Sequence, residues 1–352
     1  DLLSRADLLK AALVGAGATC LPAVASAEVT SQAVPGATVT IDDLKSFAKV
    51  AGLTFTEEEL KKILPSVTGT QKWAGLRSAT NSYDLMPATV YRAPGADKFT
   101  ETSVNITLPI TQIAKPANDE DVAFLTVHEL GYLIRNKLIS SVDLTRVYLN
   151  RIKKYGPKLF CVVTLCEDLA LKQAKAADDL LAKGTYLGPL HGIPYGIKDL
   201  FAVEGYPTQW GTEAFKGQTV PGNSAVFERL TAAGAVLLAK LSLGALAMDD
   251  KWFGGQTKNP WNPAQGSSGS SAGSASAMAA GLAAFTIGTE TSGSIVSPSL
   301  RCRVTGFRPT FGSISRYRGM SLSWTMDKVG PITRTAEDAA IVFTALVGRD
   351  NR

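Results

Sequence analysis

Two serines and one lysine are placed so that they could carry out acyl transfer. Ser270 and Ser294 lie in turns rich in glycine and serine, and Lys198 lies in an apolar run upstream of them. A hydroxyl is a weak nucleophile at neutral pH, and a lysine among apolar groups can lose its charge and take the hydroxyl proton. Since the chain has only 2 histidines, His128 and His191, we expect a lysine to act as the base.

Four sequence blocks surround these residues. They are GIPYGIKD at 192–199, SGSSAGS at 268–274, GTETSGSI at 288–295 and DKVGPITRT at 327–335. In this order they resemble the amidase signature family of the Ser-cisSer-Lys type, and the resemblance runs from about residue 121 to residue 350. Position by position, it assigns the catalytic lysine to Lys198, the bridging serine to Ser270 and the nucleophile to Ser294.

The resemblance also implies a reaction and a site. Neutral Lys198 would take the proton of Ser270, which takes that of Ser294, and Ser294 would attack the amide carbonyl to form an acyl-enzyme that water releases. The backbone amides of Thr291, Ser292, Gly293 and Ser294 would form an oxyanion hole, and a cis peptide bond would precede Ser270. We therefore expect an amidase that cleaves carboxylic amide C–N bonds of small molecules, with no cofactor and no metal ion.

Four positions depart from the family's usual residues. Glu290 replaces an aspartate, Ser292 and Ala272 replace glycines, and Val296 stands where an arginine is common. A serine at position 292 would be strained if the oxyanion loop required a positive φ there. Val296 indicates a less polar pocket wall and argues against anionic substrates. No catalytic atom is lost in these replacements.

A second serine matches another nucleophile motif. Residues 269–273, GSSAG, fit the G-x-S-x-G turn of α/β-hydrolases, which would make Ser271 the nucleophile. That fold needs a histidine after the serine, whereas His128 and His191 both precede it. Two further alternatives stay open: a partner-dependent glutaminase like the A subunit of a tRNA amidotransferase, and an amidase-like scaffold without activity.

The first residues resemble an export signal. Arg5 precedes an apolar stretch of small residues at 11–24 and an A-x-A pattern at 25–27, with Ala6 in place of the second arginine of a twin-arginine signal. The stretch is shorter than the roughly 20 residues that span a bilayer. If the signal works, we expect a periplasmic or secreted protein, and otherwise a cytoplasmic one.

Composition fits an enzyme core. The 352 residues are 45% hydrophobic and 19% charged, which is enough to bury a large core. The net charge of +5 without a run of basic residues predicts no nucleic-acid partner, and no later segment predicts a membrane span. Cys161, Cys166 and Cys302 are expected to be buried thiols, because their number and spacing fit no disulfide framework.

The elements that must position these residues alternate between helix and strand. Thr40 and Thr56 precede acidic residues and predict helices at 40–50 and 56–64, and Ser141 is expected to cap the first core helix. Further helices are predicted at 169–183, 226–233 and 275–282, and strands at 161–165, 193–197, 235–239 and 284–287. This alternation predicts an α/β fold, and the resemblance implies the amidase signature fold, a large twisted mixed sheet with helices on both faces.

The expected organisation has three parts. Residues 1–27 would form the signal-like segment, 28–115 a helical extension and linker, and 116–352 the amidase signature core. Members of the family usually continue beyond the point that matches residue 350. We therefore expect the core to be incomplete at its C-terminal end.

Overall fold

The computed structural model describes residues 38–78 and 112–350, which fall into two units, one holding 38–78 and the other 112–350. The predicted signal-like segment at 1–27 and much of the predicted linker lie outside the described residues. The first unit contains helices α2 (Ile41–Val50) and α3 (Glu57–Ser78).

Both helices of the first unit begin where the sequence predicts. The Thr40 hydroxyl accepts the N–H of Asp43 while the Asp43 carboxylate accepts the N–H of Thr40, and Thr56 and Glu59 form the same reciprocal pair. The sequence predicts that helix α3 ends at Leu64, but it continues through Pro65. A proline inside a helix removes one backbone hydrogen bond, and here that loss does not end the helix.

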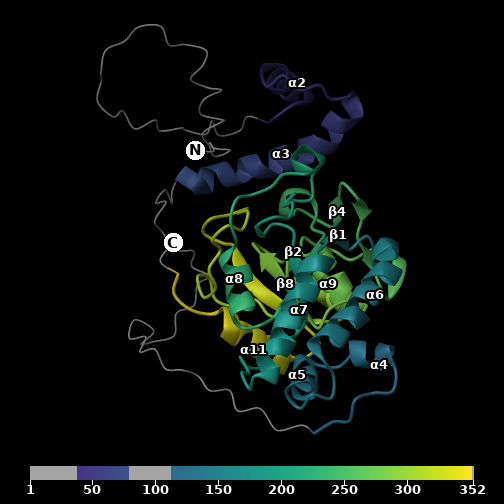
Figure 1. Ribbon diagram of the computed structural model, residues 1–352. Coiled ribbons are helices and arrows are strands. Elements are labelled where there is room, and N and C mark those ends of the chain that lie inside the picture. The colour runs from purple at the N-terminus through teal and green to yellow at the C-terminus, as the bar shows by residue number, and fades with distance from the viewer. Residues whose placement is uncertain (1–37, 79–111, 351–352) are drawn as a thin grey trace. The chain divides into compact units, whose positions relative to one another are not determined.

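A six-stranded mixed sheet forms the core of the second unit (Figure 1). Its order is β1-β3-β2-β8-β10-β9, with β2 parallel to β3 and to β8 and the remaining pairs antiparallel. The strands are β1 (Val162–Leu165), β2 (Pro194–Lys198), β3 (Val236–Leu241), β8 (Phe285–Glu290), β9 (Thr305–Gly306) and β10 (Lys328–Thr333). Every residue of β2 and β3 is buried, as expected for parallel strands covered on both faces.

Helices cover both faces of this sheet. The connection from β2 to β3 and that from β3 to β8 run in opposite directions across the sheet, so right-handed crossovers place α8 and α9 on opposite faces. Helix α11 packs against α8 and β10 (Figure 1). The helices are α4 (Asp119–Ala123), α5 (Val127–Arg135), α6 (Ser141–Leu159), α7 (Glu167–Ala182), α8 (Ala225–Ala232), α9 (Ala272–Ala279), α10 (Val296–Cys302) and α11 (Ala336–Leu346).

Two small hairpins lie between β3 and α9. Strand β4 (Lys251–Trp252) pairs with β5 (Gly255–Gln256), and β6 (Lys258–Asn259) pairs with β7 (Asn262–Gly266). The sequence does not predict these short strands, because segments of two to five residues are too short to show an alternation of apolar and polar positions.

The predicted α/β architecture is confirmed, with corrections at its start. Helices α4 and α5 precede the first predicted core helix, and each has its own side-chain cap, Asn118 and Thr126. The residue that caps α6 is Ser140, whose hydroxyl accepts the N–H of Asp143, whereas the Ser141 hydroxyl donates to the carbonyl of Gly192. The two neighbouring serines offered equivalent caps, and the tertiary contact with Gly192 decides between them.

The buried face of α6 and the thiols follow the prediction. Leu144, Val147, Tyr148 and Ile152 are all buried. Cys161, Cys166 and Cys302 are buried free thiols, and burial raises the pKa of each to about 12. Within the described ranges, none of the helices has both the length and the apolar character needed to cross a membrane.

Candidate active site

Lys198 ends the central strand β2 and is fully buried. Its Nζ lies 2.8 Å from Ser270 Oγ, 2.9 Å from Thr289 Oγ1 and 3.1 Å from Ser271 Oγ. Burial lowers the pKa of this ammonium group to about 7, and the more distant carboxylates of Asp327 and Glu290 oppose that shift. In the part of the chain described, no carboxylate forms an ion pair with Lys198. The amine is therefore available in its neutral form near pH 7.

Ser270 lies in the turn that leads into α9, and its hydroxyl faces Lys198. The peptide bond between Gly269 and Ser270 is cis, as the resemblance implies. Asp250 holds this turn, because its Oδ2 accepts the N–H of Ser268 at 2.9 Å. Gly269 is required here, since a Cβ at this position would lie 1.8 Å from the carbonyl oxygen of Asp249.

Ser271 occupies the position that the G-x-S-x-G match would make the nucleophile. Its side chain is fully buried. The hydroxyl donates to the Thr289 carbonyl at 3.0 Å and accepts the Thr289 N–H at 3.1 Å, while Lys198 Nζ lies equally close. A hydroxyl with its donor and acceptor positions occupied by the protein has no free approach to a substrate. The geometry therefore disfavours Ser271 as nucleophile.

Ser294 lies in the loop between β8 and α10. It is partly exposed, and its hydroxyl has no hydrogen-bond partner among the residues described. The Ser294 carbonyl accepts the N–H of Ser271 at 3.1 Å, which ties this loop to the Ser270 turn. Backbone amides of Ser292, Gly293 and Ser294 likewise donate to no acceptor in the described structure. This loop therefore presents a free hydroxyl beside unpaired N–H groups.

The backbone of the loop also accounts for the replacement at position 292. Gly293 has a φ of +127°, a conformation that favours glycine. Ser292 is not among the described residues with positive φ. The serine at this position is therefore unstrained, and the glycine that the loop needs is the next residue.

Glu290, the other departure in this block, organises the loop. The side chain is 3% exposed, and its Oε2 accepts the N–H groups of Ile295 and Val296 at 2.9 Å each. It thereby closes the segment that carries Ser294 and caps α10. Arg308 Nη1 lies 3.7 Å from its other carboxylate oxygen. In the sequence, Glu290 is notable only because it replaces the family's usual aspartate. Its hydrogen bonds to the loop are not predicted.

Asp327, just before strand β10, and Lys328, its first residue, support the loop. The Asp327 carboxylate accepts the hydroxyl of Thr291 and the N–H groups of Leu322 and Ser323. Lys328 Nζ donates to the Thr291 carbonyl at 3.0 Å. These two residues begin the fourth sequence block, DKVGPITRT. The sequence alone predicts no function for its residues.

A cavity of about 430 Å³ adjoins these residues. Thr289, Asp327 and Lys328 form one part of its wall. Most of the rest is apolar or aromatic, and includes Leu200, Phe201, Tyr317, Met320 and Trp324. Val296, which the sequence suggests as a pocket wall residue, is exposed on α10 and does not line this cavity.

Neither histidine belongs to this cluster. The N–H of Leu187 donates to Nδ1 of His191 at 3.3 Å, so Nε2 carries the proton and donates to the Ala177 carbonyl at 2.9 Å. His191 thus holds the turn before β2. In the described ranges, no group of three or more His, Cys, Asp or Glu side chains is placed to hold a metal ion.

The chain is similar to proteins of known family. The family model described as Amidase matches residues 143–352. The A subunit of the glutamyl-tRNA(Gln) amidotransferase from Methylococcus capsulatus is 42% identical over 230 residues, which cover 64% of this chain and 47% of that protein.

Two solved structures are also similar. The native peptide amidase from Stenotrophomonas maltophilia has a TM-score of 0.62 and 39% identity, covering 65% of this chain and 49% of that one. A bacterial aryl acylamidase of the amidase signature enzymes has a TM-score of 0.60 and 29% identity, covering 65% and 49%. The chain therefore spans about half the length of the relatives that it matches.

Proposed function

The chain belongs to the amidase signature family, and from this premise we propose that it is an amidohydrolase that cleaves carboxylic amide C–N bonds through a serine acyl-enzyme. The observation that carries the proposal is the buried amine of Lys198, 2.8 Å from the Ser270 hydroxyl and with a pKa lowered to about 7.

This chain supplies a side chain or backbone group for each step of the proposed reaction. Neutral Lys198 accepts the Ser270 proton, and Ser270 accepts the proton of Ser294 as Ser294 Oγ forms a bond to the amide carbon. Negative charge on the carbonyl oxygen is stabilised by the N–H groups of residues 291–294, for which one donor contributes about 3 kcal/mol in comparable hydrolases. The relay returns the proton to the leaving amine, and water then hydrolyses the ester.

The apolar cavity beside Thr289 supports a substrate with an apolar or aromatic substituent. We expect Met320→Trp to fill part of this cavity and to lower kcat/KM for amides with a bulky side group by about tenfold or more, because overpacking excludes the group. Acetamide-sized substrates serve as the control and should be affected much less. Equal losses on small and large amides would contradict this placement.

The activity itself is tested by release of free acid and amine from a panel of amides. The panel includes C-terminal peptide amides, anilides and glutamine, each with wild-type protein that carries its natural ends. We expect hydrolysis of at least one amide class, and its loss by several orders of magnitude in Lys198→Ala and in Ser294→Ala. Hydrolysis that survives in both variants would overturn the proposal.

A glutaminase is the second candidate, favoured by the 42% identity with the A chain of a glutamyl-tRNA(Gln) amidotransferase. That function predicts hydrolysis of glutamine that depends on co-purifying partner proteins. Hydrolysis of other amides by the isolated protein supports the first candidate instead.

We also propose that the protein is exported. The support is the apolar stretch at 11–24 followed by Ala25-Ser26-Ala27. N-terminal sequencing of the mature protein should begin at residue 28, and an intact N-terminus on protein recovered from the cytoplasm would contradict export.

A further inference from the structure

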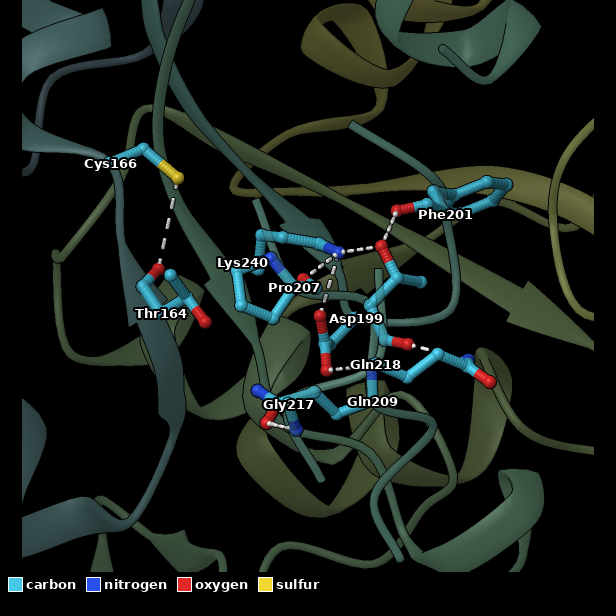
Figure 2. A network of polar contacts seen from close by, with 10 residues as sticks. Thr164, Cys166, Asp199, Phe201, Pro207, Gln209, Gly217, Gln218 and Lys240 are labelled. Atoms are coloured by element: carbon cyan, nitrogen blue, oxygen red, sulfur yellow. Dashed lines mark hydrogen bonds and ion pairs between the residues drawn. The ribbon is translucent and has the colours of Figure 1, made fainter. Parts of the chain in front are cut away.

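Asp199, the residue that follows Lys198, forms a buried ion pair with Lys240, and Figure 2 shows both members of this pair. Lys240 of β3 and Asp199, the residue after β2, are both fully buried, and Lys240 Nζ lies 2.8 Å from Asp199 Oδ1. Lys198 pairs with Leu241 in the sheet register, and Lys240 pairs with Ile197. Because neighbouring positions along a strand point to opposite faces, the two lysines lie on opposite faces of the sheet.

The pair fastens a loop to the ends of β2 and β3. Lys240 Nζ also donates to the Pro207 carbonyl at 2.6 Å and to the Thr208 hydroxyl. Asp199 Oδ2 accepts the N–H of Gln209 at 3.0 Å, and the Asp199 N–H donates to the Leu241 carbonyl at 2.9 Å. Figure 2 shows the contact of Lys240 with Pro207 and that of Asp199 with Gln209.

The same loop supports the segment that holds the Ser270 turn. The Trp210 carbonyl accepts the N–H of Leu246 at 2.8 Å, and the Gly211 carbonyl accepts the N–H of Phe253 at 3.1 Å. Between these two points lies Asp250, whose carboxylate binds the N–H of Ser268. The ion pair is thus adjacent to Lys198 along the chain and is connected to Ser270 through residues 207–250.

Net stability does not account for such a pair. The cost of removing two charges from water offsets most of their attraction, and apolar residues of similar volume often stabilise a fold as well or better. Burial dominates at this pair, raising the pKa of the Asp199 carboxyl and lowering the pKa of the Lys240 ammonium group. The geometry that the pair imposes is the better explanation for its presence.

We propose that Asp199 and Lys240 are positioning residues that hold Lys198 and Ser270 at reacting distance. They touch no substrate and act through the ends of β2 and β3 and through the loop at 207–211. The inference rests on the proposed function, because it assigns Lys198 and Ser270 to the proton relay.

The test is the double variant Asp199→Asn with Lys240→Met in the full-length protein. The two substitutions remove one negative and one positive charge, so the net charge around Lys198 does not change. We expect kcat to fall by about tenfold to a hundredfold, because a displacement of about 1 Å costs that much, while KM changes by less than about threefold. Loosening of the loop also admits water to Lys198, so the pKa seen in the pH profile of kcat/KM rises.

The control variant is Leu133→Ala, a substitution of a buried residue in helix α5, which carries neither member of the ion pair. It should lower the melting temperature without altering kcat or the pH profile. A double variant with wild-type kcat and pH profile would overturn the positioning role. If the double variant fails to fold, Thr208→Val carries the test, since it removes one Lys240 contact, and an unchanged kcat and profile there would likewise overturn the role.

A readout without turnover separates this inference from the proposed function. In protein labelled with carbon-13 at lysine Cε, NMR titration reports the pKa of Lys198, identified by the signal lost in Lys198→Ala. A higher pKa in the double variant supports positioning even if wild-type protein hydrolyses no amide tested. If wild-type protein hydrolyses no amide and its Ser294 is not labelled by a fluorophosphonate, the proposed function is contradicted. The positioning role is not contradicted by that result.

Discussion

The side chain of Lys198 is fully buried, and its amine nitrogen contacts three hydroxyl groups and no carboxylate within the described structure. Serine and threonine hydroxyls solvate an ammonium group less well than water does, so the neutral amine is favoured. That preference is what a general base at neutral pH needs. It also means that one buried group affects both the reaction and the stability of the fold.

The pH dependence of the rate follows from this burial. We expect kcat/KM to rise with pH through an apparent pKa of about 7, because only the neutral amine accepts the Ser270 proton. His191→Ala is the matched control, since this side chain holds a turn and does not contact Lys198 or Ser270 in the described structure. This variant should keep the profile and most of the rate, and loss of the profile in it would point to a histidine base.

The free energy of unfolding should depend on the titration of the same group and, like the rate, should rise with pH. The unfolded chain holds a proton on Lys198 up to pH 10.5, whereas the folded protein releases it near pH 7. Between these values the unfolded state binds more protons, so the free energy of unfolding rises with pH. Lys198→Met should therefore stabilise the protein by a few kcal/mol below pH 7, and this gain should shrink toward pH 10.5. Denaturant unfolding at several pH values measures it, and a gain independent of pH would contradict the assignment.

At the scale of elements, the loop between β8 and α10 is held from several sides. Glu290 accepts two N–H groups of the loop end, Lys328 binds its first carbonyl, and Ser271 binds the Ser294 carbonyl. Strands β8 and β10 pair without a register shift, and the pairing begins where Lys328 lies opposite Glu290. Two neighbouring strand ends thus fix where the Ser294 hydroxyl is presented.

Substitution of Glu290 should change the geometry of the loop without removing any residue of the proposed proton relay. In Glu290→Ala the buried N–H of Ile295 and the partly buried N–H of Val296 lose their acceptor, at a cost of about 1–3 kcal/mol for the buried group, and kcat should fall by about tenfold or more. Glu290→Gln keeps one oxygen as acceptor and is the control, so it should retain more of both stability and rate. Equal rates in the two variants would argue against a role for these hydrogen bonds.

At the scale of the whole molecule, the core of the fold was predictable because its strands are apolar runs framed by glycine. The cap of α6 was assigned to Ser141 instead of Ser140, because the choice depends on the tertiary contact of Ser141 with Gly192, and the short helices α4 and α5 were not predicted. The three catalytic candidates could be named from motifs. The Asp199–Lys240 pair could not, because its members are 41 positions apart in the sequence and only the parallel pairing of β2 with β3 brings them together.

The most direct measurement of the central claim is mass spectrometry of the protein after reaction with a fluorophosphonate, which forms a stable adduct with an activated serine. The account predicts one adduct on Ser294, its loss in Ser294→Ala, and much slower labelling in Lys198→Ala, because the hydroxyl needs the relay to lose its proton. Ser271→Ala should still be labelled at Ser294. An adduct on Ser271, or labelling of Ser294 that proceeds equally fast without Lys198, would contradict the account.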